Sequence, residues 1–218
     1  MSTKILVNAE WRIGSGSLDS AREQVERSVS VALDSGVGLY VFAGGLASKN
    51  SPLVHHASAL AVDVARRLKS KGIPSLWLAG AADRVPDGQN GTTLGALDAS
   101  GFGQVITEPT LLHADGPDNP PEVPQVVALP YGPYNPARWL QQTACKMKAT
   151  KRARALVIGA LPVGVNTAAP DVTFPARECQ KWFPQVTMFA GHHAEAEERQ
   201  GVTLLGSLAS GELTLLEL

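Results

Sequence analysis

Carboxylate and imidazole groups both bind transition metals, and Glu10 and the pair His192-His193 carry such groups. Arg12, two residues after Glu10, cannot be a ligand, because a guanidinium has no free lone pair. If both side chains point inward, we expect an Arg12–Glu10 ion pair, since an unpaired buried charge costs about 3–5 kcal/mol. The alternative is an Arg12 exposed on a loop.

A second candidate position is the turn that follows the apolar run 75–79, which reads Gly80-Ala81-Ala82-Asp83. Turns at the carboxyl ends of parallel strands are where α/β sheets usually place their chemistry. An alanine side chain can neither coordinate a metal nor transfer a proton. Asp83 is therefore the ionisable group that this turn contains.

A third candidate is a group of basic residues close together near the end of an expected helix. Its members are Lys146, Lys148, Lys151, Arg152 and Arg154. Cations are favoured at a helix carboxyl end by the helix dipole, so a solvated surface is one interpretation. A contact surface for the phosphate backbone of nucleic acid is the other. The net charge of −1 provides no global attraction, so any affinity for nucleic acid must be local.

Several of the elements that position these residues lie between residues 4 and 83, where strand and helix alternate in the pattern of a parallel sheet with crossover helices. Short apolar runs predict strands at 4–8, 39–43, 75–79, 125–129, 155–159 and 186–190, with closing antiparallel strands at 203–205 and 213–218. Apolar residues at helical spacing predict helices that begin at a capping box (20–23), at Ser51-Pro52, near 94 and at Asn135-Pro136. Gly36 and Gly72 are expected to end the first two helices.

Composition limits the class of protein. A length of 218 residues with 44% hydrophobic content suits one α/β domain spanning 1–218. Two cysteines make neither a disulfide framework nor a zinc site. The sequence shows no signal peptide, and no apolar run approaches the roughly 20 residues of a membrane helix. We therefore expect no membrane association and a cytoplasmic protein, or one built into an assembly formed inside a cell.

The residues at the expected strand ends resemble, in order, those of the calcineurin-like metallophosphoesterases, and most closely the SbcD-type DNA-repair nucleases. The matching blocks begin at Glu10, Gly44, Gly80, Gly159 and Gly191. The resemblance extends from Lys4 to about Glu212. It implies a four-layer sandwich of two facing mixed β-sheets flanked by helices. In that family two metal ions clamp a phosphate and activate a water molecule.

The resemblance also implies seven metal-ligand positions. They are occupied here by Glu10, Arg12, Gly45, Ala81, Ala160, His192 and Ala194. Of these, His192 is unchanged and Glu10 is a partial match. Ala82 stands where the family has a phosphate-facing histidine, and Asp83 stands where an aspartate supports the turn. The pattern predicts a protein that keeps the fold of this enzyme family but lacks most of the side chains that its catalysis needs.

We therefore expect a catalytically inactive phosphoesterase-like scaffold that needs no cofactor. The alternative that the resemblance leaves open is a metal-dependent phosphodiesterase or nuclease with a rearranged site, in which Glu10, His192 and His193 hold a single Mn²⁺ or other divalent ion. A homo-oligomer or a protein partner is expected, and nucleic acid is a further candidate partner. SbcD-type proteins carry capping and ATPase-binding segments beyond the core, and we expect neither extension in this chain.

Overall fold

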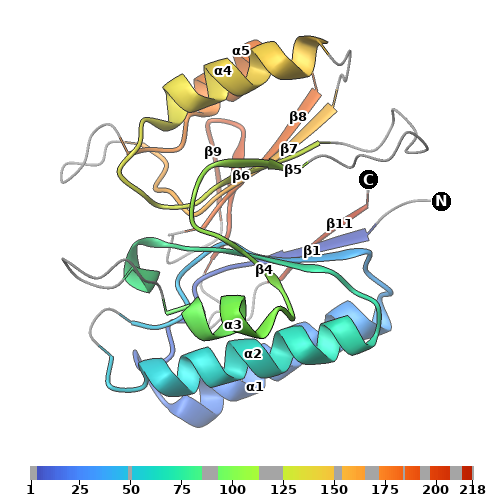
Figure 1. The fold of residues 1–218 in the computed structure, drawn as a ribbon, viewed down its shortest axis with the longest axis vertical. Helices are drawn as coiled ribbons and strands as arrows, with labels where there is room; N and C mark the ends of the chain where they lie inside the picture. Colours follow the sequence, from blue (N-terminus) through green and yellow to red (C-terminus); the bar gives the residue numbers. More distant parts are fainter. Residues whose placement is uncertain are drawn as a thin grey trace.

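The computed structural model describes residues 4–48, 51–84, 93–112, 125–149, 154–164, 172–183, 185–191, 197–206 and 213–217. The side chains of 146–149 and 154 are not among the described parts. These residues build four layers: three helices, two facing sheets and two further helices (Figure 1). The expected fold class, two mixed β-sheets flanked by helices, is confirmed.

The first sheet is built mainly from the amino-terminal half of the chain. It contains β1 (Lys4–Asn8), β2 (Leu39–Phe42), β3 (Ser75–Leu78), β4 (Gln104–Ile106) and β11 (Thr214–Glu217), in the order β11-β1-β2-β3-β4. Strands β1 to β4 are parallel, and β11 runs antiparallel at the edge beside β1. The carboxyl ends of β1, β2 and β3 therefore meet at one edge of this sheet.

The second sheet is built from the remaining strands. It contains β5 (Thr110–Leu112), β6 (Gln125–Leu129), β7 (Arg154–Gly159), β8 (Gln185–Ala190), β9 (Glu197–Arg199) and β10 (Val202–Leu204), in the order β5-β6-β7-β8-β10-β9. The expectation for 203–205 was half right, because β10 is antiparallel to β9 but parallel to β8. The tight turn at Gln200-Gly201, with φ of 56° and 74°, reverses the chain between β9 and β10. The two strands therefore form an antiparallel hairpin.

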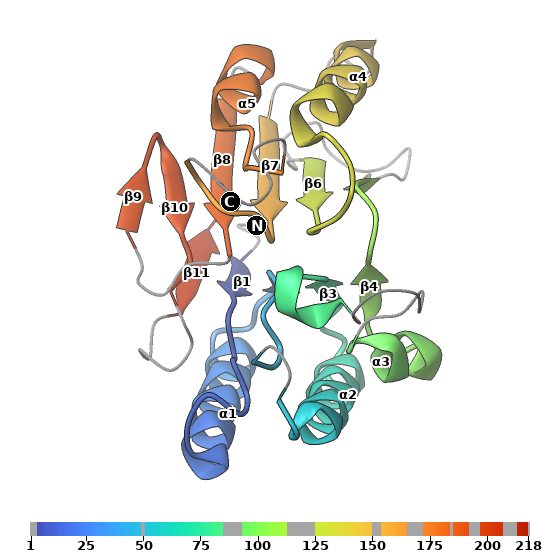
Figure 2. The same ribbon diagram turned by 90° about the vertical axis from the view of Figure 1, so that its left-hand side faces the viewer.

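The helices cover the outer faces of the two sheets, as Figures 1 and 2 show. The layer on the first sheet contains α1 (Leu18–Asp34), α2 (Val54–Ser70) and α3 (Gly95–Ser100), and the layer on the second contains α4 (Pro136–Ala149) and α5 (Ala176–Trp182). No helix among the described residues is long and apolar enough to cross a membrane.

Two expected helix starts are wrong. Helix α1 begins at Leu18, before the proposed capping box, and its N-cap Ser17 makes no side-chain capping bond. Helix α2 begins at Val54, because Ser51 uses its Oγ to accept a hydrogen bond from Leu53 N (3.1 Å) in a turn that precedes the helix. The start of α4 is confirmed, since Asn135 Oδ1 accepts a hydrogen bond from Arg138 N at 2.9 Å.

Three apolar layers hold the sandwich together. One lies between the first sheet and its helices, one between the second sheet and its helices, and one between the two sheets. The layer between the sheets includes Val7, Val41, Leu78, Ile158 and Phe189. Burial of this layer fixes the two sheets face to face and brings their carboxyl-terminal loops together.

Candidate functional site at the strand ends

The loop after β1 is held alongside the loop after β2. Glu10 N donates to Gly44 O at 2.8 Å, Arg12 N donates to Gly45 O at 2.9 Å, and Ile13 N donates to Leu46 O at 3.2 Å. Glu10 and Arg12 have left-handed backbone conformations, with φ of 54° and 47°. Such conformations cost about 1 kcal/mol or more for residues other than glycine, and they persist where surrounding contacts over-determine them.

Trp11 anchors this loop between its two strained neighbours. Its side chain is buried, and its indole Nε1 donates to Asn8 Oδ1 at 2.9 Å. The ring lies edge-on to Phe42 and Trp77, with centroids 5.1 and 5.5 Å away. Aromatic pairs of this geometry stabilise by about 0.5–1.5 kcal/mol each beyond simple burial. The buried indole therefore fixes the positions of the residues on either side of it.

Glu10 and Arg12 form the ion pair expected from the sequence. Arg12 Nε donates to Glu10 Oε2 at 2.7 Å. The side chain of Glu10 is 7% exposed and that of Arg12 is 39% exposed. The carboxylate is thus largely removed from water while the guanidinium covers it from the solvent side, which is an arrangement that avoids an uncompensated buried charge.

The carboxylate of Glu10 also fills the space beside Gly45. A Cβ built on Gly45 would lie 2.5 Å from Glu10 Cδ and 2.5 Å from its Oε1, and Gly45 has a φ of 84°. A side chain at position 45 would therefore collide with Glu10 and strain the backbone. The resemblance places a bridging aspartate at position 45, so the inward Glu10 and such an aspartate exclude one another here.

Asp83 ties the β3 turn to the β2 turn. Its Oδ2 accepts hydrogen bonds from Gly80 N and Gly45 N, both 2.8 Å, and its Oδ1 accepts one from Leu46 N at 2.8 Å. Thr93 Oγ1 donates to Oδ1 at 3.3 Å. Burial raises the pKa of Asp83, and the backbone hydrogen bonds oppose that rise. Asp83 therefore holds the two turns together through its carboxylate.

The strand ends of both sheets meet at these turns. A Cβ on Gly44 would lie 2.8 Å from Gly80 Cα and 2.9 Å from Ala160 Cβ, so Ala160 directly faces the two glycine turns. Gly191 N donates to Gly159 O at 2.8 Å, and a Cβ on Gly191 would collide with Ala43 O. The five sequence blocks are therefore brought together, as far as they are described.

The described residues at this edge do not supply the ligands of a two-metal centre. Glu10 is paired with Arg12, Asp83 is engaged by three backbone N–H groups, and Gly45, Ala81 and Ala160 have no donor atoms in their side chains. Within the described ranges, no three His, Cys, Asp or Glu residues lie together as a metal site. His192, His193 and Ala194 lie outside the described residues.

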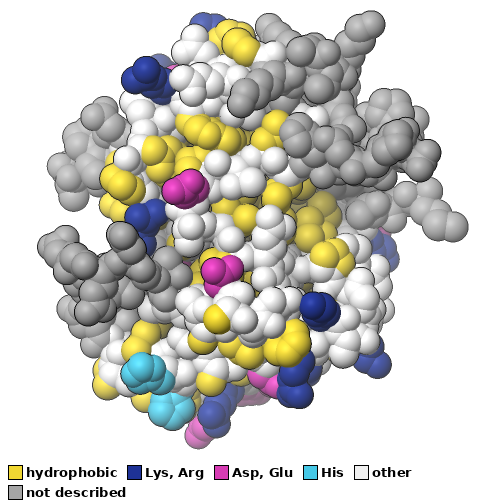
Figure 3. Space-filling model, viewed as in Figure 1, with side chains coloured by type: hydrophobic (Ala, Val, Ile, Leu, Met, Phe, Trp, Pro, Cys, Tyr) yellow, Lys and Arg dark blue, Asp and Glu magenta, His cyan; other side chains and the backbone are white. Residues whose placement is uncertain are grey.

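Other residues singled out from the sequence lie elsewhere. Lys146 and Lys148 fall in the last turn of α4 and Arg154 begins β7, but these side chains, and the whole of Lys151 and Arg152, are outside the described parts. His55 and His56 are exposed near the start of α2, and histidines appear in cyan at the surface in Figure 3.

Sequence reasoning missed Arg84. Its Nε donates to Tyr131 O at 2.6 Å and its Nη2 donates to Thr107 O at 3.1 Å. It therefore links the loop after β3 to the loops that follow β4 and β6. Its place directly after Asp83 is the only signal in the sequence, because both acceptors are backbone carbonyls that no sequence pattern marks.

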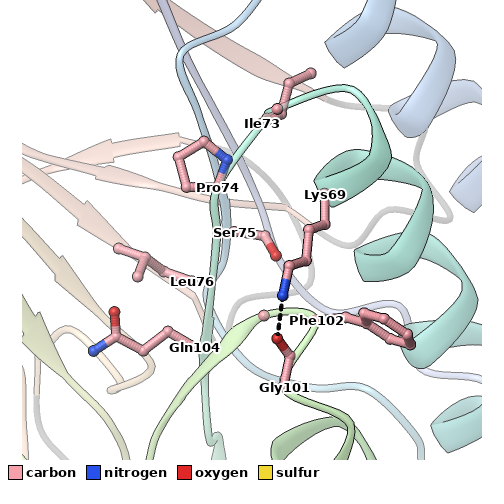
Figure 4. Close-up of a pocket in the computed structure, with 10 residues that line it drawn as sticks. Lys69, Ile73, Pro74, Ser75, Leu76, Gly101, Phe102 and Gln104 are labelled. Carbon is pink, nitrogen blue, oxygen red and sulfur yellow. Dashed lines mark hydrogen bonds between the residues drawn. The ribbon is translucent and has the colours of Figure 1, made fainter.

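A pocket of about 440 Å³ lies at the opposite end of the first sheet, near the amino ends of β3 and β4 (Figure 4). Lys69 reaches across it from the end of α2, and its Nζ donates to Gly101 O at 2.9 Å. Ser75, Phe102 and Gln104 also line it. None of the residues expected at the candidate site takes part in this pocket.

Comparisons with known proteins agree with this architecture. No protein-family model and no curated protein matches the sequence. The solved structure of TT1561 of Thermus thermophilus is similar, with a TM-score of 0.57 and 14% identity over 100% of this chain and 95% of that chain. A dimetal phosphatase from Danio rerio is similar with a TM-score of 0.61 and 11% identity, over 95% of this chain and 88% of that chain.

A third structure, nuclease MPE of Pseudomonas putida, has a TM-score of 0.46 and is too distant to bear on the fold. At these identities the likeness establishes architecture and not activity. The chain therefore shares the fold of the dimetal phosphatase, an α/β sandwich of two mixed β-sheets flanked by helices.

Proposed function

We propose that this protein is a catalytically inactive member of the metallophosphoesterase-like folds and acts as a structural or binding scaffold in the cytoplasm. The ordered sequence blocks place it nearest the SbcD-type branch, as a single domain with a degenerate metal site. Its partners on this proposal are further copies of itself or another protein. No cofactor is required.

The observation that carries this proposal is the position of the Glu10 carboxylate. It lies where a side chain on residue 45 would begin, and Arg12 Nε holds it there at 2.7 Å. A guanidinium beside the ligand positions adds positive charge where a cation would have to bind, which opposes metal binding. In an active enzyme of this fold, two metal ions would activate the nucleophile and bind the phosphate, so a site that opposes metal binding would lack both functions.

Manganese-dependent hydrolysis of bis(p-nitrophenyl) phosphate tests the proposal, alongside metal analysis of the purified protein and a thermal-shift titration with Mn²⁺. An active metallophosphoesterase serves as the positive control. We expect no turnover above the no-protein blank, no retained metal and no shift in Tm. Turnover that requires Mn²⁺ and disappears in His192→Ala would instead support the rearranged site of Glu10, His192 and His193.

Oligomeric state is a separate measurement within the same proposal. Light scattering coupled to size exclusion should give a mass that is a multiple of 22.9 kDa for a self-assembling scaffold. A monomer at all concentrations would contradict self-assembly, and the proposed scaffold would then bind another protein.

A further inference from the structure

A groove lined by basic residues lies between α4 and α5. These two helices cover the outer face of the second sheet, on the far side of the molecule from α1 and α2 (Figure 1). The volume of the groove is about 340 Å³. Its walls come from the first turns of α4 and from the whole of α5. The lining residues are Ala137, Arg138, Gln141, Arg177, Glu178, Lys181 and Trp182.

The charges of this groove are unbalanced. Arg138, Arg177 and Lys181 are exposed, and Glu178 is the single carboxylate in the lining. Within the described parts of the chain, no ion pair involves any of these three cations. On α2, by contrast, Arg66 and Arg67 are paired with Asp63 and Glu26. The α4–α5 groove therefore carries positive charge that the described residues do not neutralise.

The groove also has a flat aromatic wall. Trp182 is partly buried, and Lys181 Nζ lies 5.5 Å from the centroid of its ring. Gln141 also lines the groove, with an amide that can both donate and accept hydrogen bonds. An aromatic ring beside cations that no described carboxylate pairs is a combination suited to single-stranded nucleic acid, through base stacking and phosphate contacts.

We propose that the α4–α5 groove binds the backbone of a single-stranded nucleic acid. The guanidinium groups of Arg138 and Arg177 match phosphate oxygens in two-point contacts, and Lys181 adds a point charge. Trp182 provides a surface for a base, which a strand of acidic side chains would not use. This inference goes beyond the proposed scaffold function and does not depend on the strand-end site.

Fluorescence anisotropy with a labelled 20-nucleotide oligothymidylate tests the proposal on the full chain, from 25 to 200 mM salt. The charge variant is Arg138→Gln/Arg177→Gln/Lys181→Gln. Its matched control is Arg22→Gln/Arg27→Gln/Lys71→Gln, which removes three exposed cations from α1 and the end of α2. Both variants lose the same net charge, and circular dichroism checks that both are folded.

We expect the groove variant to bind about 10- to 100-fold more weakly at 50 mM salt, with the control unchanged within about threefold. The slope of log K against log salt should fall by about 2 in the groove variant, since each lost phosphate contact to a single strand contributes about 0.7. Equal losses in the two triple variants, or no binding of the oligonucleotide at 25 mM salt, would overturn the proposal.

The aromatic wall is tested by Trp182→Leu, with Trp139→Leu as its control, because both rings pack on the same apolar layer and only Trp182 lines the groove. Trp182→Leu should weaken binding about 5- to 100-fold with little change in the salt slope. If Trp182→Leu has no effect and polyglutamate displaces the oligonucleotide at equal charge, the groove binds acidic protein and the nucleic-acid proposal is wrong.

Discussion

The carboxylate of Glu10 takes the volume beside Gly45, because the Cδ of Glu10 lies 2.5 Å from the position that a Cβ on Gly45 would have. The two positions belong to neighbouring parallel strands, β1 and β2, whose following loops are hydrogen-bonded to each other. The inward position of the Glu10 carboxylate therefore depends on position 45 having no side chain, and Gly45 meets that requirement.

Gly45→Asp should lower the free energy of unfolding by about 2–4 kcal/mol, because the new side chain meets Glu10 and the backbone φ of 84° is strained for any residue with a Cβ. The double variant Glu10→Ala/Gly45→Asp should recover at least about 1 kcal/mol relative to the sum of the two single changes. Urea denaturation of the four proteins measures this coupling. Additive effects would show that the two side chains do not compete for space.

Arg12→Gln should destabilise the protein by about 1–2 kcal/mol. It removes the 2.7 Å contact between Arg12 Nε and the carboxylate of Glu10, whose side chain is 7% exposed, while the 39% exposure of Arg12 lets water screen part of the loss. Glu10→Gln/Arg12→Gln should be more stable than Arg12→Gln alone, because the buried charge is gone. Chemical denaturation decides this, and an unchanged midpoint for Arg12→Gln would mean that the pair contributes nothing.

Asp83→Ala should be among the most damaging single substitutions, at about 3–5 kcal/mol. It removes the acceptor of three buried backbone N–H groups, on Gly80, Gly45 and Leu46, each 2.8 Å from a carboxylate oxygen. Asp83→Asn keeps one acceptor oxygen and should cost less. Thermal unfolding followed by circular dichroism compares the two variants. If Asp83→Asn loses as much stability as Asp83→Ala, the negative charge and not the number of accepted hydrogen bonds explains the loss.

Gln125→Leu should stabilise the protein. Gln125 is fully buried at the start of β6, and among the described residues neither its Oε1 nor its Nε2 has a hydrogen-bond partner. An unsatisfied buried polar group costs about 1–3 kcal/mol, and an apolar side chain of similar volume removes that cost. We expect Tm to rise by roughly 2–4 °C per kcal/mol gained for a chain of this size. A lower Tm would indicate that bound water satisfies the amide in solution.

Tyr40 should make stability depend on pH in the alkaline range. Burial raises the pKa of Tyr40 from 10.0 to about 12, and the contact of its Oη with Ser28 Oγ (3.1 Å) opposes that rise. The folded state holds the phenol proton to higher pH than the unfolded state does. The tyrosine contribution is therefore intact below pH 10 and falls by about 1.4 kcal/mol per pH unit as pH rises from 10 to about 12.

Tyr40→Phe should remove this part of the alkaline loss. The difference in unfolding free energy between the wild type and Tyr40→Phe should shift by about 2–3 kcal/mol in favour of Tyr40→Phe between pH 9.5 and pH 12. Urea midpoints measured across that range provide the comparison. The other groups that titrate there are common to both proteins, so a constant difference would show that Tyr40 ionises normally.

The sequence by itself determined the order of the main elements and the local relationship between neighbouring side chains. Short apolar runs and amphipathic segments identified six strands and the long helices, because those signals are local. The Arg12–Glu10 pair was also predictable, since two residues of opposite charge on one short loop can meet without help from the rest of the chain.

Only the tertiary structure decided which distant groups meet. Asp83 binds Gly45 N and Leu46 N, which are 38 and 37 residues away, and nothing local in the sequence marks those amides as its partners. Strands β4 and β5 have three residues each, too few to show a period, and they exist because they add to sheets that are already formed. The filling of the Gly45 space by Glu10 has the same origin, since it follows from packing two parallel strands side by side and not from any pattern within either one.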